Sequence, residues 1–243
     1  MASITFLGTG ASVVTSKRMC SGVLFGDKLI DVGFGVLANL VQSQTRLDSI
    51  NEVYISHTHS DHIGDFTGLI WAMAMENRIK PIRVVSSAGT AETLRKILEL
   101  QSTPWSWLKF KVDFVRPESV RVSSSRTAHD PETLAFRFET PKGSFVYGAD
   151  TAKSDALAKF CAGCDLLIHD ATFLDGQEST AALTNHSTAR DAGGVAGQAH
   201  VGRLVLTHIS PGNQNAEKKY VSQASSGFEG EIVVAKDHET MVL

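Results

Sequence analysis

Apolar and polar residues follow two different periods along this chain, and together they predict alternating strands and helices. Short apolar runs rich in β-branched and aromatic residues are typical of strands. They lie at residues 4–7, 22–25, 28–31, 53–55, 82–86, 112–115, 119–123, 134–140, 144–147, 165–168 and 204–208. Because the runs from 112 to 147 follow one another closely, we expect that region to be antiparallel.

Helical spacing of apolar residues separates several of these runs. Phe66, Leu69, Ile70 and Met73 recur at intervals of three and four within 63–77, which predicts one helix there. Further helices are expected at residues 35–42, from residue 89 to about 98, at 152–160, and after a cap at Ser187 or Thr188.

The composition is that of an ordinary globular protein, with 42% hydrophobic and 20% charged residues among 243. No linker divides the chain, so we expect a single domain over residues 1–243. No apolar run approaches 18 residues and no signal peptide is recognisable, which predicts no membrane partner. Three cysteines form no disulfide framework, and this fits a cytoplasmic protein.

A net charge of −3 argues against a strongly basic nucleic-acid-binding protein. Five cationic residues lie close together in the sequence: Lys109, Lys111, Arg116, Arg121 and Arg126. We interpret them as residues on the solvated faces of exposed strands, in preference to a patch that binds phosphate. The Cys161-x-x-Cys164 pair has no second pair beside it, which favours a structural role over a redox or zinc-binding one.

Four potential metal ligands follow the strand at 53–55 within six residues. His57 and His59 are two positions apart, so on extended backbone both side chains point the same way and can share one ion. Asp61 and His62 lie where the chain turns into a helix, and can therefore serve a second ion. A lone His-x-His is usually not a metal site, but three histidines and an aspartate in this order strongly indicate one.

The motif His57-x-His59-x-Asp61-His62 resembles the signature of the metallo-β-lactamase superfamily. The resemblance implies an α/β fold, a four-layer αβ/βα sandwich of two mixed β-sheets flanked by helices, with metals at one edge. The segment 6–12, Phe-Leu-Gly-Thr-Gly-Ala-Ser, resembles the opening of the ribonuclease Z branch, and we interpret its glycines as a tight turn near the site. By the same resemblance Asp31 supports the segment 57–62, here called the metal loop, without being a ligand.

The resemblance also implies the remaining ligands. His129 corresponds to the histidine of the third motif, Asp150 to the aspartate of a strand ending in Gly-x-Asp-Thr, and His208 to the last ligand. The expected set is His57, His59 and His129 on one ion, Asp61, His62 and His208 on the other, and Asp150 between them. Imidazole and carboxylate ligands suit two divalent ions, with zinc favoured and manganese or iron also accommodated.

Three residues are expected to act in catalysis. Asp61 is expected to serve twice, as a ligand and in orienting or deprotonating water. The segments His169-Asp170-Ala171-Thr172 and His186-Ser187-Thr188 resemble the family's His-Glu-Ala-Thr and His-Ser-Thr motifs, with aspartate in place of glutamate. By resemblance Asp170 and His186 form a pair that protonates the leaving oxygen. His169 is expected to be structural, and His200 and His238 to lie on the surface.

These residues predict a binuclear metal-dependent hydrolase. A phosphodiesterase acting on a small phosphodiester or short RNA-like substrate is favoured over ribonuclease Z-type processing of transfer RNA. Only 21 positions separate His129 and Asp150, which leaves no room for the exosite arm of the processing enzymes. The chain also continues Ser210-Pro211 where the family usually places an arginine shortly after the serine.

Three other functions stay open at this point. An ester, thioester or lactone hydrolase is the next choice, because the same site attacks acyl carbonyls. A binding protein without turnover and a di-iron redox enzyme are less favoured, since all seven ligands are present and no flavin domain accompanies them. The resemblance also implies a homodimer.

Overall fold

The computed structural model describes residues 3–103 and 105–243, and its strands form two mixed sheets. The first sheet has the order β13-β1-β2-β3-β4-β5-β6. Its strands are β1 Ser3–Gly8, β2 Gly22–Phe25, β3 Lys28–Ile30, β4 Glu52–Tyr54, β5 Ile82–Val85, β6 Val112–Val115 and β13 Thr240–Val242. The second has the order β12-β11-β10-β9-β8-β7. Its strands are β7 Ser123–Arg126, β8 Leu134–Thr140, β9 Gly143–Tyr147, β10 Leu166–Asp170, β11 Arg203–Thr207 and β12 Glu231–Val234.

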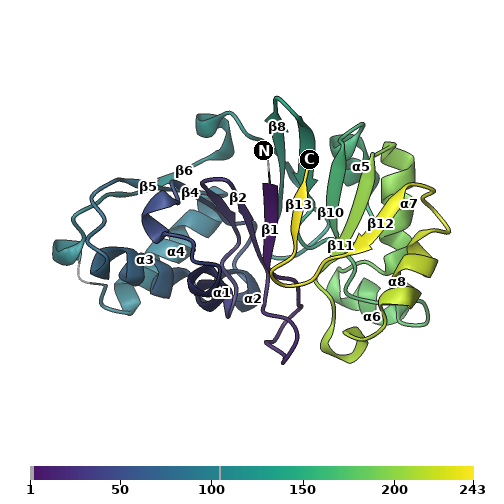
Figure 1. The fold of residues 1–243 in the computed structure, drawn as a ribbon, viewed down its shortest axis with the longest axis horizontal. Helices are drawn as coiled ribbons and strands as arrows, with labels where there is room; N and C mark the ends of the chain where they lie inside the picture. The colour runs from purple at the N-terminus through teal and green to yellow at the C-terminus, as the bar shows by residue number, and fades with distance from the viewer. Residues whose placement is uncertain (1–2, 104) are drawn as a thin grey trace.

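Helices cover the outer face of each sheet, which gives the four layers that the motif predicted (Figure 1). The first sheet is covered by α1 Val36–Gln42, α3 Phe66–Met75 and α4 Ala88–Leu100. The second is covered by α5 Asp155–Cys161, α7 Ala189–Ala199 and α8 Glu217–Ala224. The short helices α2 Ser60–Ile63 and α6 Glu178–Thr184 lie at the lower edge of the view. None of the described helices is long and apolar enough to cross a membrane.

A third core fills the space between the two sheets. Aromatic side chains from both sheets meet there: the rings of Tyr54 and Phe136 are 5.4 Å apart, edge to face, and those of Phe138 and Phe145 are stacked at 4.7 Å. Parallel strands such as β4 and β10 are buried along their whole length because one face meets this core and the other meets the helices. Because both faces of these strands are buried, the strands are held in place, and so are the loops that follow them at the edges of the sheets.

The helix predicted at 63–77 is confirmed over α3, where its four apolar residues are buried, but it begins only at Phe66 because a break separates it from α2. Asp65 lies at the break, and its Oδ2 accepts hydrogen bonds from the backbone N–H groups of Gly35 (2.9 Å) and Leu37 (3.0 Å). These groups belong to the first turn of α1, where N–H donors lack partners within the helix. Asp65 therefore ties the metal loop to α1 instead of continuing a helix.

The antiparallel arrangement predicted from 112 to 147 is also partly wrong. β6 pairs in parallel with β5 at the edge of the first sheet. The predicted strand at 119–123 is instead a 3-10 turn, Pro117–Val120, followed by Arg121 with a positive φ of 58°, and β7 begins only at Ser123. The chain uses this turn to cross from one sheet to the other, a change that periodicity cannot register.

Two helix starts also differ from those predicted. α5 begins at Asp155, where the Ser154 hydroxyl caps it by accepting from the Leu157 N–H, instead of at 152. α4 begins at Ala88, capped by the Ser87 side chain, instead of at 89. The predicted cap of α7 is confirmed at Thr188, which forms a capping box with Asp191.

Candidate metal centre

The residues predicted to bind metal come from loops at one edge of the two sheets. β3 and β4 run parallel, as do β9, β10 and β11, so their carboxyl ends emerge together at the edge that carries α2 and α6 in Figure 1. The segment 57–62 follows β4, Asp150 follows β9, His208 follows β11, and His129 precedes β8, which is antiparallel to β9. The fold therefore brings together side chains that lie up to 151 positions apart in the sequence.

The first group of donors consists of His57, His59, His129 and Asp150. His59 Nδ1 lies 3.1 Å from His57 Nε2 and 3.2 Å from His129 Nε2. Asp150 Oδ2 lies 3.6 Å from His57 Nε2 and 3.9 Å from His129 Nε2. A tetrahedral ion with bonds of about 2.0–2.1 Å separates its ligand atoms by about 3.3 Å, so these spacings fit one divalent cation.

The second group consists of Asp61, His62 and His208, and it meets the first at Asp150. His208 Nε2 lies 3.3 Å from His62 Nε2 and 3.2 Å from Asp61 Oδ2. Asp150 Oδ2 lies 3.1 Å from His62 Nε2 and 3.4 Å from His208 Nε2. The same carboxylate oxygen is therefore within reach of both groups, which is the arrangement a bridging ligand requires.

Burial and charge prepare these side chains for a cation. Burial lowers the pKa of His57 well below its ordinary value, so its imidazole is neutral and its lone pair is available. Burial favours the protonated form of Asp150, but the facing imidazoles of His208 and His62 outweigh it and hold the pKa of the carboxyl well below its usual range. An ionised carboxylate surrounded by imidazoles is a donor set that fits divalent cations.

Asp31 contacts Nδ1 of His62, the ring nitrogen that faces away from the other candidate ligands, which agrees with the supporting role expected for it. Its Oδ2 lies 2.8 Å from His62 Nδ1 and accepts hydrogen bonds from the hydroxyls of Ser56 (2.8 Å) and Tyr147 (2.7 Å). Its Oδ1 accepts from the Ser56 N–H (2.8 Å). A carboxylate on Nδ1 keeps the proton there and leaves Nε2 with a lone pair. Ser56 and Tyr147 were not anticipated, since strand periodicity assigns both simply to the interior.

Two more hydrogen-bonding groups from outside the predicted set orient the imidazoles of His208 and His129. The Thr172 hydroxyl lies 2.8 Å from His208 Nδ1, and the carbonyl oxygen of Asn185 lies 2.9 Å from His129 Nδ1. In each case the contacted nitrogen faces away from the cluster, so Nε2 is the one that faces in. Thr172 follows Asp170 by two positions in the motif described above, and this was the only sequence signal for it.

Asp170 and His186 form the predicted pair, despite the shorter acidic side chain. Asp170 Oδ2 lies 2.8 Å from His186 Nδ1, and the buried carboxylate also accepts from the N–H groups of Thr151 (3.2 Å) and Thr172 (2.8 Å). Burial works to lower the pKa of His186, but the negative charge of Asp170 outweighs it and raises the pKa to about 9. His186 is therefore protonated at neutral pH.

A cavity of about 470 Å³ opens over this cluster. The glycine-rich turn after β1 lies at its wall, as expected: Ser12 lines the cavity, and its N–H donates to Asp61 Oδ2 at 2.7 Å. His59, His129 and His186 line it as well. The arrangement combines a place for cations, a protonated imidazole and space for a small molecule.

The residues assigned to structural or surface roles stay outside the cluster. His169 is buried, and its Nδ1 contacts the Asp170 carbonyl at 2.7 Å. His200 and His238 are exposed. Cys161 and Cys164 are buried free thiols whose pKa values are raised by burial, which leaves them unreactive.

The cation cluster between residues 109 and 126 is largely neutralised by neighbouring carboxylates. Lys111 pairs with Asp113, Arg116 lies 3.6 Å from Glu118, and Arg126 lies 3.5 Å from Glu132. These side chains are exposed, which agrees with the interpretation of solvated faces.

Comparison with known families identifies the class of protein. A family model described as a beta-lactamase superfamily domain matches residues 28–209, three quarters of the chain. The chain therefore belongs to the beta-lactamase superfamily, and its two mixed sheets with flanking helices are the metallo-β-lactamase fold.

Named relatives show which members of the superfamily this chain resembles. The chain is 27% identical to the ribonuclease Z of Haloarcula marismortui over 295 aligned positions, covering 96% of this chain and 94% of the relative. Because 96% of 243 residues is about 233, roughly 60 of the 295 positions have no counterpart here. Such relatives, together with the clustered imidazoles and carboxylates, indicate a metal-dependent hydrolase.

Solved structures agree on the fold. The metallo-β-lactamase fold protein YhfI from Bacillus subtilis has a TM-score of 0.84 at 23% identity, covering 98% of each chain. The short form of human tRNase Z has a TM-score of 0.81 at 25% identity, covering 99% of this chain and 98% of the other.

Proposed function

We propose that this protein is a phosphodiesterase that uses two divalent cations, preferentially zinc, to hydrolyse small phosphodiesters. The observation that carries the proposal is Asp150 Oδ2, which lies within 3.9 Å of a donor nitrogen from each of His57, His62, His129 and His208. When bound, the cations would supply Lewis acidity, which activates water near neutral pH and stabilises negative charge on phosphoryl oxygens.

The ligand assignment follows the two groups. His57, His59 and His129 would hold one cation, Asp61, His62 and His208 would hold the other, and Asp150 would be shared between them. Asp61 also orients the attacking water, because the Ser12 N–H donates to its Oδ2 and holds the carboxylate in place. The buried carboxylates of Asp61 and Asp150 would offset part of the positive charge of the two cations.

His186 is the proton donor in this proposal. As the water oxygen gives up one proton to solvent and bonds to phosphorus, the bond from phosphorus to the leaving oxygen breaks, and that oxygen takes a proton from His186 Nε2, which solvent then restores. Nδ1 is engaged by Asp170, so Nε2 is the nitrogen left for the substrate. Asp170 is a positioning residue, which fixes the ring and keeps it protonated.

Ribonuclease Z-type 3′ processing of transfer RNA is the second candidate, and the names of the relatives favour it. Two observations favour a smaller diester. The chain lacks roughly 60 positions of that relative, and none of the described residues that line the cavity is a lysine or arginine. Processing of a precursor transfer RNA at a rate exceeding that on a nitrophenyl diester would make this candidate the better one.

The deciding experiment is hydrolysis of bis(p-nitrophenyl) phosphate by zinc-loaded and manganese-loaded protein. We expect turnover that Asp150→Ala removes and that Asp155→Ala, an exposed carboxylate outside the cavity, retains. Absence of turnover with either metal would contradict the proposal and turn attention to ester, thioester and lactone substrates.

The homodimer and the cytoplasmic location are proposed on the resemblance and on the cysteine content alone. Light scattering during size-exclusion chromatography tests the first, and a single peak at 26.2 kDa would contradict it.

A further inference from the structure

One side chain at the mouth of the metal cavity is apolar and almost fully exposed. Leu183, near the end of α6, lines the cavity and is 83% exposed. A scattered exposed leucine needs no explanation. This one stands beside the proposed proton donor, because Leu183 and His186 line the same cavity and belong to one short segment. Leu183 is therefore placed to contact a substrate that reaches His186.

Acidic side chains outnumber cationic ones around the same cavity. Three carboxylates line it, those of Asp61, Asp130 and Asp150, and none of the described lining residues is a lysine or arginine. Bound cations would offset Asp61 and Asp150, which are donors, but not Asp130, which is exposed beside His129. A second phosphate on the substrate that lies beside Asp130 would therefore meet an acidic side chain and no lysine or arginine.

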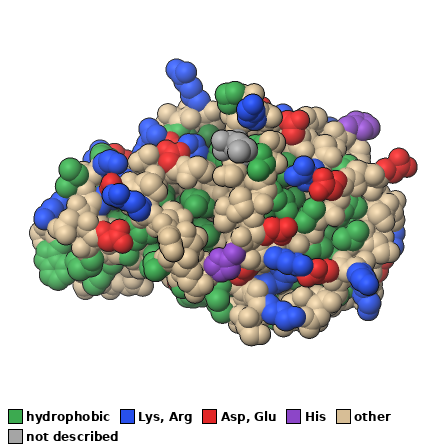
Figure 2. Space-filling view, in the orientation of Figure 1, with side chains coloured by type: hydrophobic (Ala, Val, Ile, Leu, Met, Phe, Trp, Pro, Cys, Tyr) green, Lys and Arg blue, Asp and Glu red, His purple; other side chains and the backbone are tan. Residues whose placement is uncertain are grey.

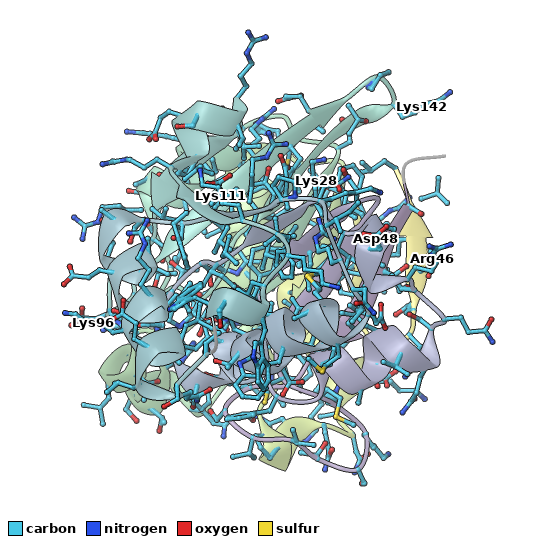
Figure 3. The ribbon with its side chains drawn as sticks, turned by 90° about the vertical axis from the view of Figure 1, so that its left-hand side faces the viewer. Lys28, Arg46, Asp48, Lys96, Lys111 and Lys142 are labelled. Atoms are coloured by element: carbon cyan, nitrogen blue, oxygen red, sulfur yellow. The ribbon has the colours of Figure 1, made fainter. Side chains whose placement is uncertain are left out.

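Lysine and arginine side chains are spread over the surface, and none of the described ones lines the cavity. Of the cations that Figure 3 labels, Lys28, Lys111 and Lys142 lie in the upper half of the molecule and Lys96 lies in the lower half. The edge with α2 and α6 is the lower one in Figure 1, and the turn between the two views keeps height unchanged. Figure 2 shows lysine and arginine side chains interspersed with acidic ones over the face it presents, with no continuous basic track.

We propose that the substrate is a phosphodiester with a single negative charge whose non-reacting ester group is apolar or aromatic, and that Leu183 selects this group. The inference rests on the phosphodiesterase function proposed above and specifies its substrate class. A leucine that gains contact with a ring removes apolar surface of both from water, which is worth about tenfold in kcat/KM for a contact of this size.

Two pairs of substrates with the same p-nitrophenol leaving group test it. We expect phenyl p-nitrophenyl phosphate to exceed methyl p-nitrophenyl phosphate in kcat/KM by about tenfold, mainly through KM. Thymidine 5′-(p-nitrophenyl phosphate) should exceed the same compound carrying a 3′-phosphate by about threefold. Equal values within both pairs would overturn the inference.

Variants locate the effect at Leu183. Leu183→Ser should remove the phenyl preference, and Leu183→Lys should remove the penalty for the 3′-phosphate. Leu100→Ser and Leu100→Lys are the matched controls, because Leu100 also lies near the end of a helix, is 84% exposed, and is not among the residues lining the cavity. A preference that persists in both Leu183 variants, or is lost equally in the Leu100 variants, would overturn the assignment.

Binding separates this inference from the proposed function. Phenylphosphonate and methylphosphonate contain no ester bond, so their affinities can be measured by calorimetry whether or not the protein turns over. We expect phenylphosphonate to bind about tenfold more tightly, and Leu183→Ser to abolish the difference. Absence of diester hydrolysis with this binding preference intact would contradict only the proposed function, whereas hydrolysis with equal affinities would contradict only the role of Leu183.

Discussion

The Thr172 hydroxyl joins the candidate metal ligand His208 to the positioning residue Asp170. It lies 2.8 Å from His208 Nδ1 and donates to Asp170 Oδ1 at 2.7 Å. A hydroxyl has one proton, and because that proton goes to the carboxylate, the oxygen accepts from His208 Nδ1–H. The lone pair of His208 is therefore on Nε2, toward the cluster. One small side chain couples the metal centre to the proton-donating pair.

Replacing Thr172 tests that coupling. Thr172→Val keeps the shape but leaves His208 Nδ1–H without its acceptor, so zinc affinity should fall by about 10–100-fold. Thr172→Ser keeps the hydroxyl and should retain most of the affinity. Competition with a chromophoric chelator measures both, and equal affinities for the two variants would show that the hydroxyl does not orient the imidazole.

The pH dependence of turnover should report His186. Its pKa is raised to about 9, so the donated proton is present below that pH and is lost as the pH rises through it. We expect kcat to fall on the alkaline side near this value. In Asp170→Asn the charge that raises the pKa is gone, so the alkaline fall should move to lower pH. A profile unchanged by Asp170→Asn would contradict the assignment of His186 as the acid.

Metal removal should destabilise the fold as well as abolish activity. Without cations, the ionised carboxylates of Asp61 and Asp150 face each other across the cluster, and binding to the native state alone is worth about 4 kcal/mol at a thousandfold excess over Kd. The melting temperature should fall by roughly 10 °C after chelation and recover with zinc. Elemental analysis should find two ions per chain, and an unchanged melting temperature would count against a preformed site.

Gly33, in the loop after β3, lies close to the backbone of the metal loop. A Cβ built there would lie 2.0 Å from the backbone oxygen of Asp61 and 2.8 Å from Cys20 Cβ. Gly33→Ala should therefore push the Asp61 backbone, reduce the free energy of unfolding by about 1–3 kcal/mol and lower metal affinity. Gly212→Ala is the control, since nothing lies within 4 Å of a Cβ there. Equal denaturant midpoints for the two variants would contradict the close approach.

Much of the site could be predicted because its signals are local. His57, His59, Asp61 and His62 lie within six residues, and alternation on extended backbone followed by a turn already assigns them in pairs. His129, Asp150 and His208 required the resemblance, since nothing in their own neighbourhoods distinguishes a ligand from a cap or a surface side chain. The structure brings all seven together.

The predictions that differ from the structure share one cause, which is that contacts with residues far away in the sequence override the local pattern. The helix predicted at 63–77 is interrupted because Asp65 bonds to the N-terminus of α1, a segment about 30 positions earlier. The strand predicted at 119–123 became a turn because the chain must leave one sheet and enter the other. A local pattern contains no information about either requirement.

The sequence by itself determined most of the strands, the loop expected to bind metal, and the superfamily to which the chain belongs, because these depend on short-range periodicity and on a compact motif. The tertiary structure decided which nitrogen each imidazole turns inward, through Asp31, Thr172 and the Asn185 carbonyl. It also decided which apolar side chain stands at the mouth of the cavity. Those outcomes depend on contacts between segments that only the packing of two sheets brings together.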